Sequence, residues 1–593
     1  MKGFGKRLCA LSLSVVMLLT SGACAVQKGG GQTAVPDTKK TQTAAPAQTQ
    51  GDAGDTAGTV ASGDEVTFKV GYARSASFEY QGDETMEDNT WTRLYKEHGV
   101  NLDVIYNVDS SQGEEKLAQS IMAGDYPDIM TVNAKYYTEW ASQGVFTDLT
   151  EAFELYASDE LKEFYNSEAG ERALKAATVD GKLYGIPGIT TPTDGMPLLW
   201  IRKDWLDHLG LDIPETVDDF YAIAKAFTEN DPDQNGQDDT YGLALNGKDV
   251  FTSTGDIGTY FEMFGVQPGY YTNNIPFVEK DGKAVYGGAD SEAMKEGLAL
   301  LQDMYQNGYI SRDFITAGGD QIDQDMSAGK VGMAFSWFAA AQKPWQNALE
   351  TQPDVNIISV PIPGITAQDR GQAFYTASPQ SYITLSSQND NIEKFFEVVN
   401  LGLHYMTQLD KLTQEEYEMY NGLPGKYTGF DACLTMFWIP FKNSMSWARI
   451  QEALKTGDTS KMNPENLRDY NAMRVYYDNR DRRDELTEEE LGAFNGGLLY
   501  WVVYGNEHCA YQSLDEMAKM DNFQYSAFEA SATEKMNEYT TTLTTLTKET
   551  IIDIIIGNRD VDAYDDFLES WNSLGGAEIT AEADAWFQSS KAN

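Results

Sequence analysis

Hydrophobic and polar residues alternate from Glu65 onward in a way that predicts strands separated by helices. Strands show a period of two, whereas the helices repeat their apolar positions every three or four residues and stop at glycine. The predicted elements alternate as strand, helix, strand, helix, strand: Val66–Tyr72, Asn89–His98, Val100–Tyr106, Lys116–Ala123 and Asp128–Val132. This order favours a parallel sheet with helices on both faces.

Polar and aromatic residues follow two of these strands directly. Arg74 and Ser75 come after the first strand, and Asn133 and Tyr136 come after the third. Ligands of open α/β sheets bind beyond the carboxyl ends of the strands. These four residues are therefore candidate ligand contacts, and Arg74 and Ser75 are suited to a ligand hydroxyl or carboxylate.

The chain begins with the three parts of a secretory signal. Lys2, Lys6 and Arg7 form a basic start, Leu8–Thr20 is apolar but too short to span a bilayer comfortably, and small residues follow. Residues 1–23 are thus predicted to be a signal peptide. We expect an exported protein.

Cys24 follows the small residues, and this arrangement resembles the lipobox of bacterial lipoproteins, in which the cysteine is diacylated. Ser21 departs from the aliphatic residue usual there, and ordinary cleavage beside an uninvolved cysteine is the alternative. Ala25–Gly63 contains no Leu, Ile, Met, Phe, Tyr or Trp, so it has little apolar surface to bury. Residues 24–63 are predicted to be a lipidated tether, which places the protein on the outer face of the bacterial cell membrane.

The charge and the rarity of His and Cys narrow the function further. The chain has 44 Lys+Arg and 91 Asp+Glu, a net charge of −47, so nucleic acid is excluded as the main partner. Four histidines and four cysteines are scattered, without a zinc-binding or nucleophile motif. We expect a binding protein and not an enzyme, although a pair of carboxylates acting as a surface glycosidase stays open.

Several segments in order resemble family 1 extracellular solute-binding proteins, the substrate-binding lipoproteins of ATP-binding cassette (ABC) importers. Their number and spacing cover most of the chain after the tether, and the last resembles the C-terminal helices of the larger oligosaccharide-binding members. The segments are Tyr126–Thr150, Gly181–Pro187, Arg202–Leu211, Pro214–Phe227, Gly329–Trp337, Val360–Gly364 and Ile551–Gly576.

The resemblance implies an α/β, two-lobed periplasmic-binding-protein-like fold of type II, with mostly parallel sheets, a hinge, an interlobe cleft and extra C-terminal helices. Lobe 1 is expected at residues 64–187 plus 356–406, and lobe 2 at 188–355 plus 407–593. The implied function is capture of an oligosaccharide by a monomer and its delivery to an ABC permease. A peptide ligand or a sensory lipoprotein are the alternatives within this fold.

Aromatic residues are the further candidates for the cleft, because sugar rings stack on Trp and Tyr while their hydroxyls bind amides and carboxylates. The resemblance implies that Trp337 corresponds to a tryptophan that lines the cleft in this family. Asp194 and Trp200 flank the first crossing between lobes, and Trp438 lies in an apolar run (FWIPF). Core packing is the alternative for Trp337, Trp200 and Trp438.

One loop has the oxygen spacing of a calcium site. Positions 1, 3, 5, 7 and 9 of an EF-hand-like loop are occupied, with Gly236 at position 6 for the turn. The predicted Ca²⁺ ligands are Asp231, Asp233, Asn235, Gln237 and Asp239. Gly242 stands at position 12, where an EF-hand has Glu, so a solvated turn is the alternative to a structural calcium site.

Two cysteines, Cys433 and Cys509, lie in the part expected to fold. An exported protein is permitted a disulfide, but a domain of this size does not need one. A Cys433–Cys509 bridge and two buried free thiols both stay open.

Overall fold

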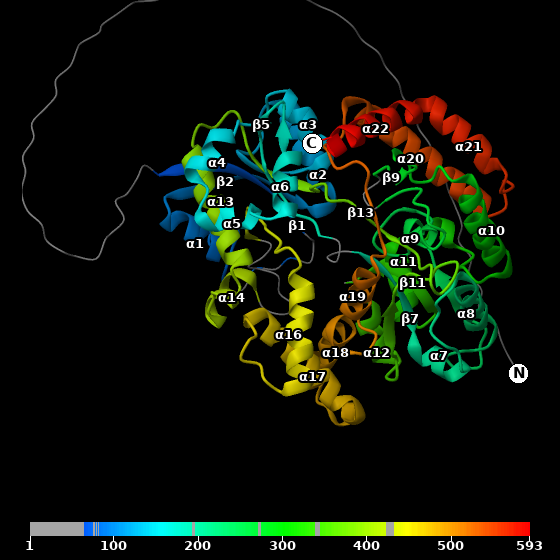
Figure 1. Ribbon diagram of the computed structural model, residues 1–593. Coiled ribbons are helices and arrows are strands. Elements are labelled where there is room, and N and C mark those ends of the chain that lie inside the picture. The colour runs from blue at the N-terminus through cyan, green and yellow to red at the C-terminus, as the bar shows by residue number, and fades with distance from the viewer. Residues whose placement is uncertain are drawn as a thin grey trace, which may run out of the picture. The chain divides into compact units, whose positions relative to one another are not determined.

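The computed structural model describes residues 65–74, 78, 80, 82–191, 196–270, 274–338, 344–422 and 432–592, which lie within one unit, Ser62–Asn593. Two sheets organise this unit. Figure 1 shows the first sheet with the N-terminal helices and the second with the helices drawn in green. The predicted signal peptide and tether, with Cys24, lie outside the described residues.

The first sheet confirms the predicted alternation of strands and helices. Its order is β2-β1-β3-β14-β6, with β1 parallel to both β2 and β3. β14 runs antiparallel to its neighbours β3 and β6, so this sheet is mixed. The strands are β1 (Val66–Arg74), β2 (Val100–Asp109), β3 (Ile129–Asn133), β6 (Ile186–Pro187) and β14 (Ser381–Leu385).

The caps around the first helices explain where these elements begin and end. The Asn89 side chain accepts hydrogen bonds from the N–H groups of Trp91 and Thr92, and the Thr92 hydroxyl accepts one from the Asn89 N–H. Gly124 ends the next helix in the left-handed region, at φ 75°. The helices of this lobe are α1 (Thr90–Glu97), α2 (Gly113–Ala123), α3 (Ala134–Ser142), α4 (Thr150–Tyr156), α5 (Asp159–Tyr165), α6 (Glu168–Ala176), α13 (Ile392–Thr407) and α14 (Gln414–Asn421), beside a small hairpin of β4 (Thr178–Val179) and β5 (Lys182–Leu183).

The second sheet has the order β12-β7-β11-β8 and is largely antiparallel, since only β11 and β8 run parallel. The expectation of mostly parallel sheets is therefore wrong in detail, although the α/β class holds. The strands are β7 (Pro197–Arg202), β8 (Tyr241–Ala244), β11 (Val331–Trp337) and β12 (Ile357–Val360). Around them lie the hairpin β9 (Phe277–Lys280) and β10 (Lys283–Tyr286) and the helices α7 (Lys203–Leu209), α8 (Val217–Glu229), α9 (Ile257–Glu262), α10 (Ser291–Asn307), α11 (Gly319–Ser327) and α12 (Pro344–Thr351).

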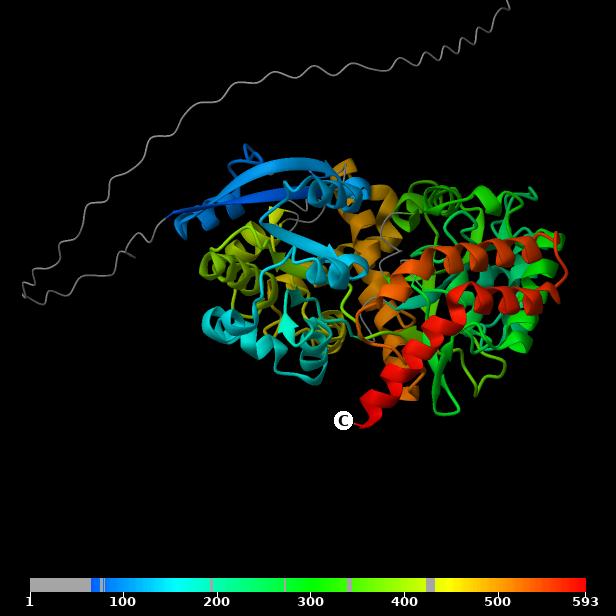
Figure 2. The ribbon, with the colours of Figure 1, turned by 90° about the horizontal axis from the view of Figure 1, so that it is seen from above.

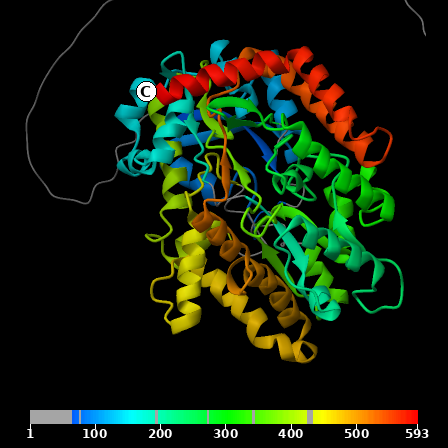
Figure 3. The same ribbon diagram turned by 45° about the vertical axis from the view of Figure 1, so that its right-hand side comes forward.

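The C-terminal third adds helices that pack on the second lobe. Figures 2 and 3 show α20 and α21 running beside α10, and Tyr564 of α21 donates to the Gly288 carbonyl at 2.8 Å. Among the described helices, none is long and apolar enough to cross a membrane. The helices are α16 (Lys442–Thr456), α17 (Pro464–Asn479), α18 (Glu488–Tyr500), α19 (Ala510–Met520), α20 (Glu534–Ile555), α21 (Ala563–Trp571) and α22 (Ala577–Ala592).

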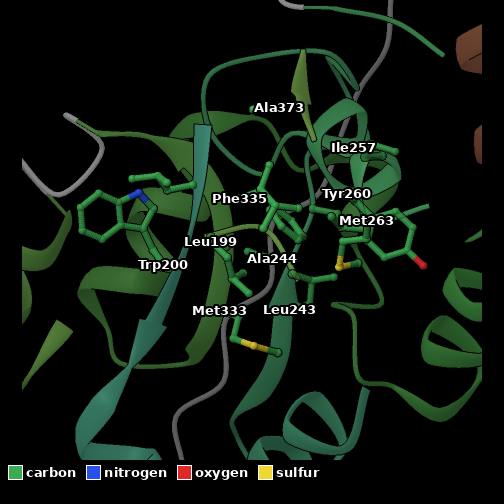
Figure 4. Packing of buried hydrophobic residues seen from close by; sticks show 14 of the residues in the cluster. Leu199, Trp200, Leu243, Ala244, Ile257, Tyr260, Met263, Met333, Phe335 and Ala373 are labelled. Carbon is green, nitrogen blue, oxygen red and sulfur yellow. The ribbon is translucent and has the colours of Figure 1, made fainter. Parts of the chain in front are cut away.

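Two separate cores define the lobes. The core of the first lobe takes in residues from Phe68 to Ile189 and from Tyr382 to Phe437. The core of the second takes in residues from Met196 to Ala377 and from Ile450 to Ala583. Figure 4 shows part of the second core, in which Trp200 and Leu199 extend to opposite sides of their strand.

These cores correct the expected lobe boundaries. β12 pairs with β7, so the second lobe continues past residue 356, and the chain returns to the first lobe only after β13 (Ala373–Tyr375). The first lobe also extends beyond residue 406, because Cys433 and Phe437 are buried in its core. The boundaries were misplaced because a buried strand has the same apolar pattern in either sheet.

A buried carboxyl group lies close to the place where the chain changes lobes. Glu262 accepts from the Phe374 N–H at 2.9 Å, and its Oε2 makes no hydrogen bond. Burial raises the pKa of Glu262 well above its ordinary value, and the nearby Asp256 raises it further. The folded chain therefore keeps a proton that the unfolded chain releases above about pH 4.3.

We expect stability to fall as the pH rises from about 4.3 toward the folded-state pKa of Glu262, because the folded state binds the extra proton. Glu262→Gln removes this dependence. Its advantage over the wild type should grow with pH, by up to about 1.4 kcal/mol per pH unit in that window. Denaturant unfolding from pH 5 to 8 measures this, with Glu549→Gln, an exposed acid in α20, as the control. Parallel pH profiles for the wild type and Glu262→Gln would contradict the shift.

Candidate functional site

Several of the predicted site residues lie at strand ends of the two sheets. The parallel strands β1 and β3 end at Arg74 and Asn133, and Ser381 at the start of β14 pairs with Asn133. In the second sheet, the end of β11 at Trp337 pairs with Pro197 at the start of β7. The edge at Asn133 borders a cavity that residues of both lobes line.

Hydrogen bonds join the segments that cross between the lobes. The Tyr375 hydroxyl donates to the Thr190 carbonyl at 3.0 Å, and the Thr190 hydroxyl donates to the Thr376 carbonyl at 3.2 Å. β13 pairs with β15 (Phe523–Tyr525), and the Ser526 N–H then donates to the Tyr375 carbonyl at 2.7 Å. These short segments form the hinge that the family resemblance implies.

A cavity of about 530 Å³ lies beside the hinge and is lined by both lobes. The first lobe contributes Asn133 and an ion pair between Lys135 and Glu114 at 3.4 Å. The second contributes aromatic and polar groups, among them Tyr270, Phe374, Asn537, Thr540, Thr544 and Lys548. Burial lowers the pKa of the Lys548 amine. The mixture of aromatic and hydroxyl groups is suited to a polar organic molecule.

Sequence reasoning missed the contribution of α20 to this cavity. Asn537, Thr541, Thr544 and Lys548 recur at helical spacing, opposite buried residues such as Leu543. A helix face rich in threonine is a usable signal, because threonine has a low helix propensity and is otherwise uncommon on a solvent face. Nothing in the sequence indicates which lobe that face meets.

Asn133 and Tyr136, the candidates after the third strand, have different positions. Asn133 lines the cavity, and its side chain caps α3 by accepting from the Lys135 N–H at 3.0 Å. Tyr136 is half-buried, stacks on Trp140 at 4.7 Å between ring centroids, and hydrogen-bonds to Lys135 Nζ. Tyr136 is not among the described residues that line the cavity.

Two of the three tryptophan candidates are exposed. Trp337 is 41% exposed at the end of β11, and Trp438 is 56% exposed. The Trp337 backbone is held from two sides, since its N–H donates to Ser253 and its carbonyl accepts from the Trp200 indole at 3.3 Å. Trp337 thus presents its ring from a fixed backbone. Neither Trp337 nor Trp438 is among the described residues that line the cavity.

Trp200 is not a ligand contact. It is fully buried in the second core, because the sheet around β7 is covered on both faces. Its Nε1 donates to the carbonyls of Ser336 and Trp337, so its role is to fix the strand end that carries Trp337. Asp194 and Ser75, which were also predicted as contacts, lie outside the described residues.

Arg74 lies on the opposite face of the first sheet from the cavity. Ala73 meets Gly113 of α2 on one face, next to the cavity residue Glu114, and side chains alternate along a strand. Arg74 therefore shares the other face with Tyr72, in the core that includes Tyr95 of α1. The guanidinium lies over the Tyr72 ring, 3.6 Å from its centroid, and donates through Nη1 to the Tyr80 hydroxyl.

Hydrogen bonds that Asn235 donates connect the acids of the predicted calcium loop. Its amide Nδ2 donates to Asp233 at 2.8 Å and to Asp239 at 3.1 Å, and its N–H donates to Asp231 at 3.1 Å. Partial burial, followed by the neighbouring Asp231 and Asp239, raises the pKa of Asp233. Across the described part of the chain, no group of three or more His, Cys, Asp or Glu side chains is arranged to hold a metal ion. Gln237, the remaining predicted ligand, is exposed.

The missing glutamate at position 12 of this loop has a packing reason. Gly242 belongs to β8, and a Cβ there would approach the Ala224 carbonyl oxygen of α8 to 2.3 Å. Any larger residue would separate β8 from α8. A cation in this loop would therefore take its protein ligands from residues 231–239, without a glutamate at position 12.

The two cysteines of the folded part are free. Cys433 is buried in the first core, where Tyr95 lies 3.8 Å from its sulfur, and Cys509 is buried at the start of α19. Burial raises the pKa of each thiol to about 12. Of the two alternatives for these residues, the structure has the free thiols and not the disulfide.

Comparisons with known proteins agree with this two-lobed arrangement. The chain is 27% identical over 508 residues to lipoprotein LipO of Bacillus subtilis. The matched region covers 84% of this chain and 88% of that protein. It is 29% identical over 266 residues to the fructooligosaccharide ABC transporter substrate-binding protein FusA of Streptococcus pneumoniae, covering 41% of this chain and 45% of that protein.

Solved structures show the same fold at low identity. The structure of FusA in complex with kestose has a TM-score of 0.59 and 17% identity and covers 89% of this chain and 100% of that one. The structure of the alginate-binding protein AlgQ2 without calcium ion has a TM-score of 0.59 and 16% identity and covers 89% of this chain and 99% of that one. The fold is therefore that of the type II periplasmic binding proteins. Because residues 76–401 match the family described as bacterial extracellular solute-binding protein, the chain belongs to that family.

Proposed function

We propose that this protein is a lipid-anchored extracellular lipoprotein that captures an oligosaccharide between its lobes and delivers it to an ABC permease. Family membership supports the solute-binding role. The name of FusA supports an oligosaccharide and an ABC transporter, and the name of LipO supports a lipoprotein. Binding, and not turnover, is the proposed activity.

The observation that carries this proposal is the exposed Trp337 at the end of β11. A sugar ring has an apolar C–H face that stacks on an indole, and its hydroxyls take amides and hydroxyls as partners. Trp337 offers the indole on a backbone fixed by Ser253 and Trp200, and Asn133 of the first lobe lines the cavity that both lobes share. A preorganised aromatic surface lowers the entropy that binding costs.

Closure about the crossing segments is the proposed mechanism. Each core stays packed, while the backbone around Thr190 and Thr376 changes its dihedral angles. A solute that contacts both edges favours the closed state, because only there does it touch both lobes. The permease would then distinguish the closed lobes from the open ones.

We also propose a structural calcium ion at the loop of Asp231, Asp233 and Asp239. The donor type is suited to Ca²⁺, since the side chains of these three residues carry oxygen, which that ion prefers. The Asn235 amide donates hydrogen bonds to both Asp233 and Asp239. A cation bound between these two carboxylates would offset their repulsion. One FusA structure is titled an EF-hand mutant, which supports a comparable loop in a relative. Calcium here would stabilise the second lobe and take no part in solute contact.

Replacing Trp337 by Ala should weaken oligosaccharide binding roughly tenfold to a hundredfold. Ring stacking contributes about 1 kcal/mol, buried area about 1–2 kcal/mol, and each ~1.4 kcal/mol is a factor of ten. Calorimetry on the tether-free protein with a glycan panel measures the effect. Tyr477→Ala is the control, because Tyr477 is 40% exposed on α17. Unchanged affinity in Trp337→Ala would remove the main support for a sugar ligand.

Chelator should lower the melting temperature of the protein, and added calcium should restore it. A cation that binds only the folded state stabilises it by about 2.7 kcal/mol at a hundredfold excess over Kd. Asp231→Ala combined with Asp233→Ala should abolish the response while solute affinity stays the same. Asp212→Ala, which removes an exposed acid outside the loop, should respond like the wild type. A melting temperature that changes with neither chelator nor calcium would rule the site out.

Cys24→Ala should release the protein from membranes or leave it unprocessed, because diacylation provides the anchor. Each buried CH₂ contributes ~0.8 kcal/mol, so two acyl chains hold a protein firmly. Membrane fractionation and intact-mass analysis of the mature N-terminus test this. Cys433→Ala is the matched control, since that thiol is buried in the first lobe. An unmodified mature N-terminus at another residue would contradict lipidation.

A further inference from the structure

α20 carries a row of polar residues on the face that lines the cavity shared by the two lobes. Asn537, Thr541 and Thr545 follow one another at intervals of four residues, so they lie along one side of the helix. The same side continues to Lys548, whereas the buried Leu543 lies on the other side. The cavity is therefore bordered by hydroxyl and amide groups over two turns of α20.

The polar groups of this row are not used within the protein. Thr540 and Thr547 donate to carbonyls of their own helix, at 2.5 and 2.8 Å. By contrast, no hydrogen bond joins the side chains of Asn537, Thr541 or Thr545 to any other residue that the structure describes. Threonine is less favourable in a helix than alanine or lysine, and an unbonded hydroxyl does not offset that cost. The stability of α20 therefore does not account for Thr541 and Thr545.

α20 is fixed firmly enough to present such a row. Thr533 caps its first turn, where the hydroxyl accepts from the Met536 N–H at 3.1 Å and donates to Glu582 of α22 at 2.6 Å. Near the other end, Gln302 of α10 donates to the Ile554 carbonyl at 2.6 Å. Groups that the fold already holds in place bind a ligand at a lower entropic cost than groups that have to be ordered.

The other walls bring the first lobe and the crossing segments to the same cavity. The first lobe contributes Asn133 and the ion pair between Lys135 and Glu114. Phe374 of the crossing segment meets Tyr270 edge to face, with 5.0 Å between the ring centroids. The volume of about 530 Å³ lies in the range of small-molecule sites. An occupant of this cavity can therefore contact α20, the first lobe and aromatic rings at once.

From this geometry we infer that α20 forms one wall of the solute site, and that Asn537, Thr541 and Thr545 select the solute through hydrogen bonds with its hydroxyl groups. This inference rests on the proposed function and adds a specificity-determining helix to it. A hydroxyl both donates and accepts hydrogen bonds, so threonine and asparagine match the hydroxyls of a sugar without requiring a charge.

The length of the row indicates how much of the solute it contacts. Residues four apart are about 6 Å apart along a helix, so the row from Asn537 to Thr545 spans about 12 Å. This length exceeds that of one sugar ring. The row therefore contacts successive units of a chain and not a single unit.

Calorimetry with trisaccharides tests the inference. The probes are kestose, maltotriose, chitotriose and trigalacturonate, and the variants are measured with the probe that the wild type binds most tightly. Thr541→Val combined with Thr545→Val keeps the shape of both side chains but removes both hydroxyls. We expect at least tenfold weaker binding, which is about 1.4 kcal/mol. Thr541→Ser combined with Thr545→Ser retains the hydroxyls and should keep the wild-type affinity. Thr542→Val is the matched control, because Thr542 is exposed on α20 but does not line the cavity.

A steric variant tests the same wall without relying on hydrogen bonds. Valine and threonine have similar shapes and helix propensities, so the double valine variant should melt at the wild-type temperature. If that variant nevertheless fails to fold, Thr541→Tyr places a large ring at an exposed position of the wall. Thr541→Tyr should weaken binding at least tenfold, and Thr542→Tyr should not. Unchanged affinity in Thr541→Tyr would overturn the inference.

The outcomes separate this inference from the proposed function. Unchanged affinity in the double valine variant, with weakened binding in Trp337→Ala, would overturn the role of α20 and leave oligosaccharide capture intact. The opposite pattern would support the α20 wall and remove Trp337 from the site. Equal losses in Thr542→Val and in the double valine variant would indicate an indirect effect through the helix and would overturn the inference. Absence of binding of every probe by the wild type would overturn both.

Discussion

The hydrogen bonds among the crossing segments determine how the two sheets face each other. Thr190 is joined to Tyr375 and Thr376, and Ser526 binds the same segment through Tyr375. Asn133, at the end of β3, lines the cavity beside these segments, whereas Trp337 at the end of β11 does not. In the proposed mechanism, rotation about this small set of backbone bonds would move one lobe against the other and leave both cores packed.

One buried ionisable group lies at this junction. Glu262 binds the backbone of the crossing segment through one oxygen, and its other oxygen makes no hydrogen bond. Elsewhere the chain pairs its buried charges, as Arg202 does with Asp204. The cost of burying Glu262 without a cation partner is expressed in its raised pKa.

Trp200 and Trp337 show how neighbouring tryptophans differ in role. They are connected by a hydrogen bond, yet Trp200 is buried and Trp337 is exposed. Trp200 lies within a strand covered on both faces, whereas Trp337 is the last residue of its strand. The buried ring therefore helps to fix the backbone that presents the exposed one.

The sequence by itself determined the local elements and the family. The period-two run at 66–72, the Asn89 cap and the Gly124 stop are local signals, so the β-α-β-α-β start was predictable. Asn133 was predicted as a ligand contact because it follows a strand, and the structure places it at the cavity, whereas Trp337 was predicted from the family resemblance and its contact with a ligand stays a prediction. Tertiary structure alone decided that β12 belongs to the second sheet, that the α20 threonines line a cavity, and that Trp200 is core. Each of these depends on which distant segment covers a given face, and apolar spacing along the chain carries no information about the partner of a face.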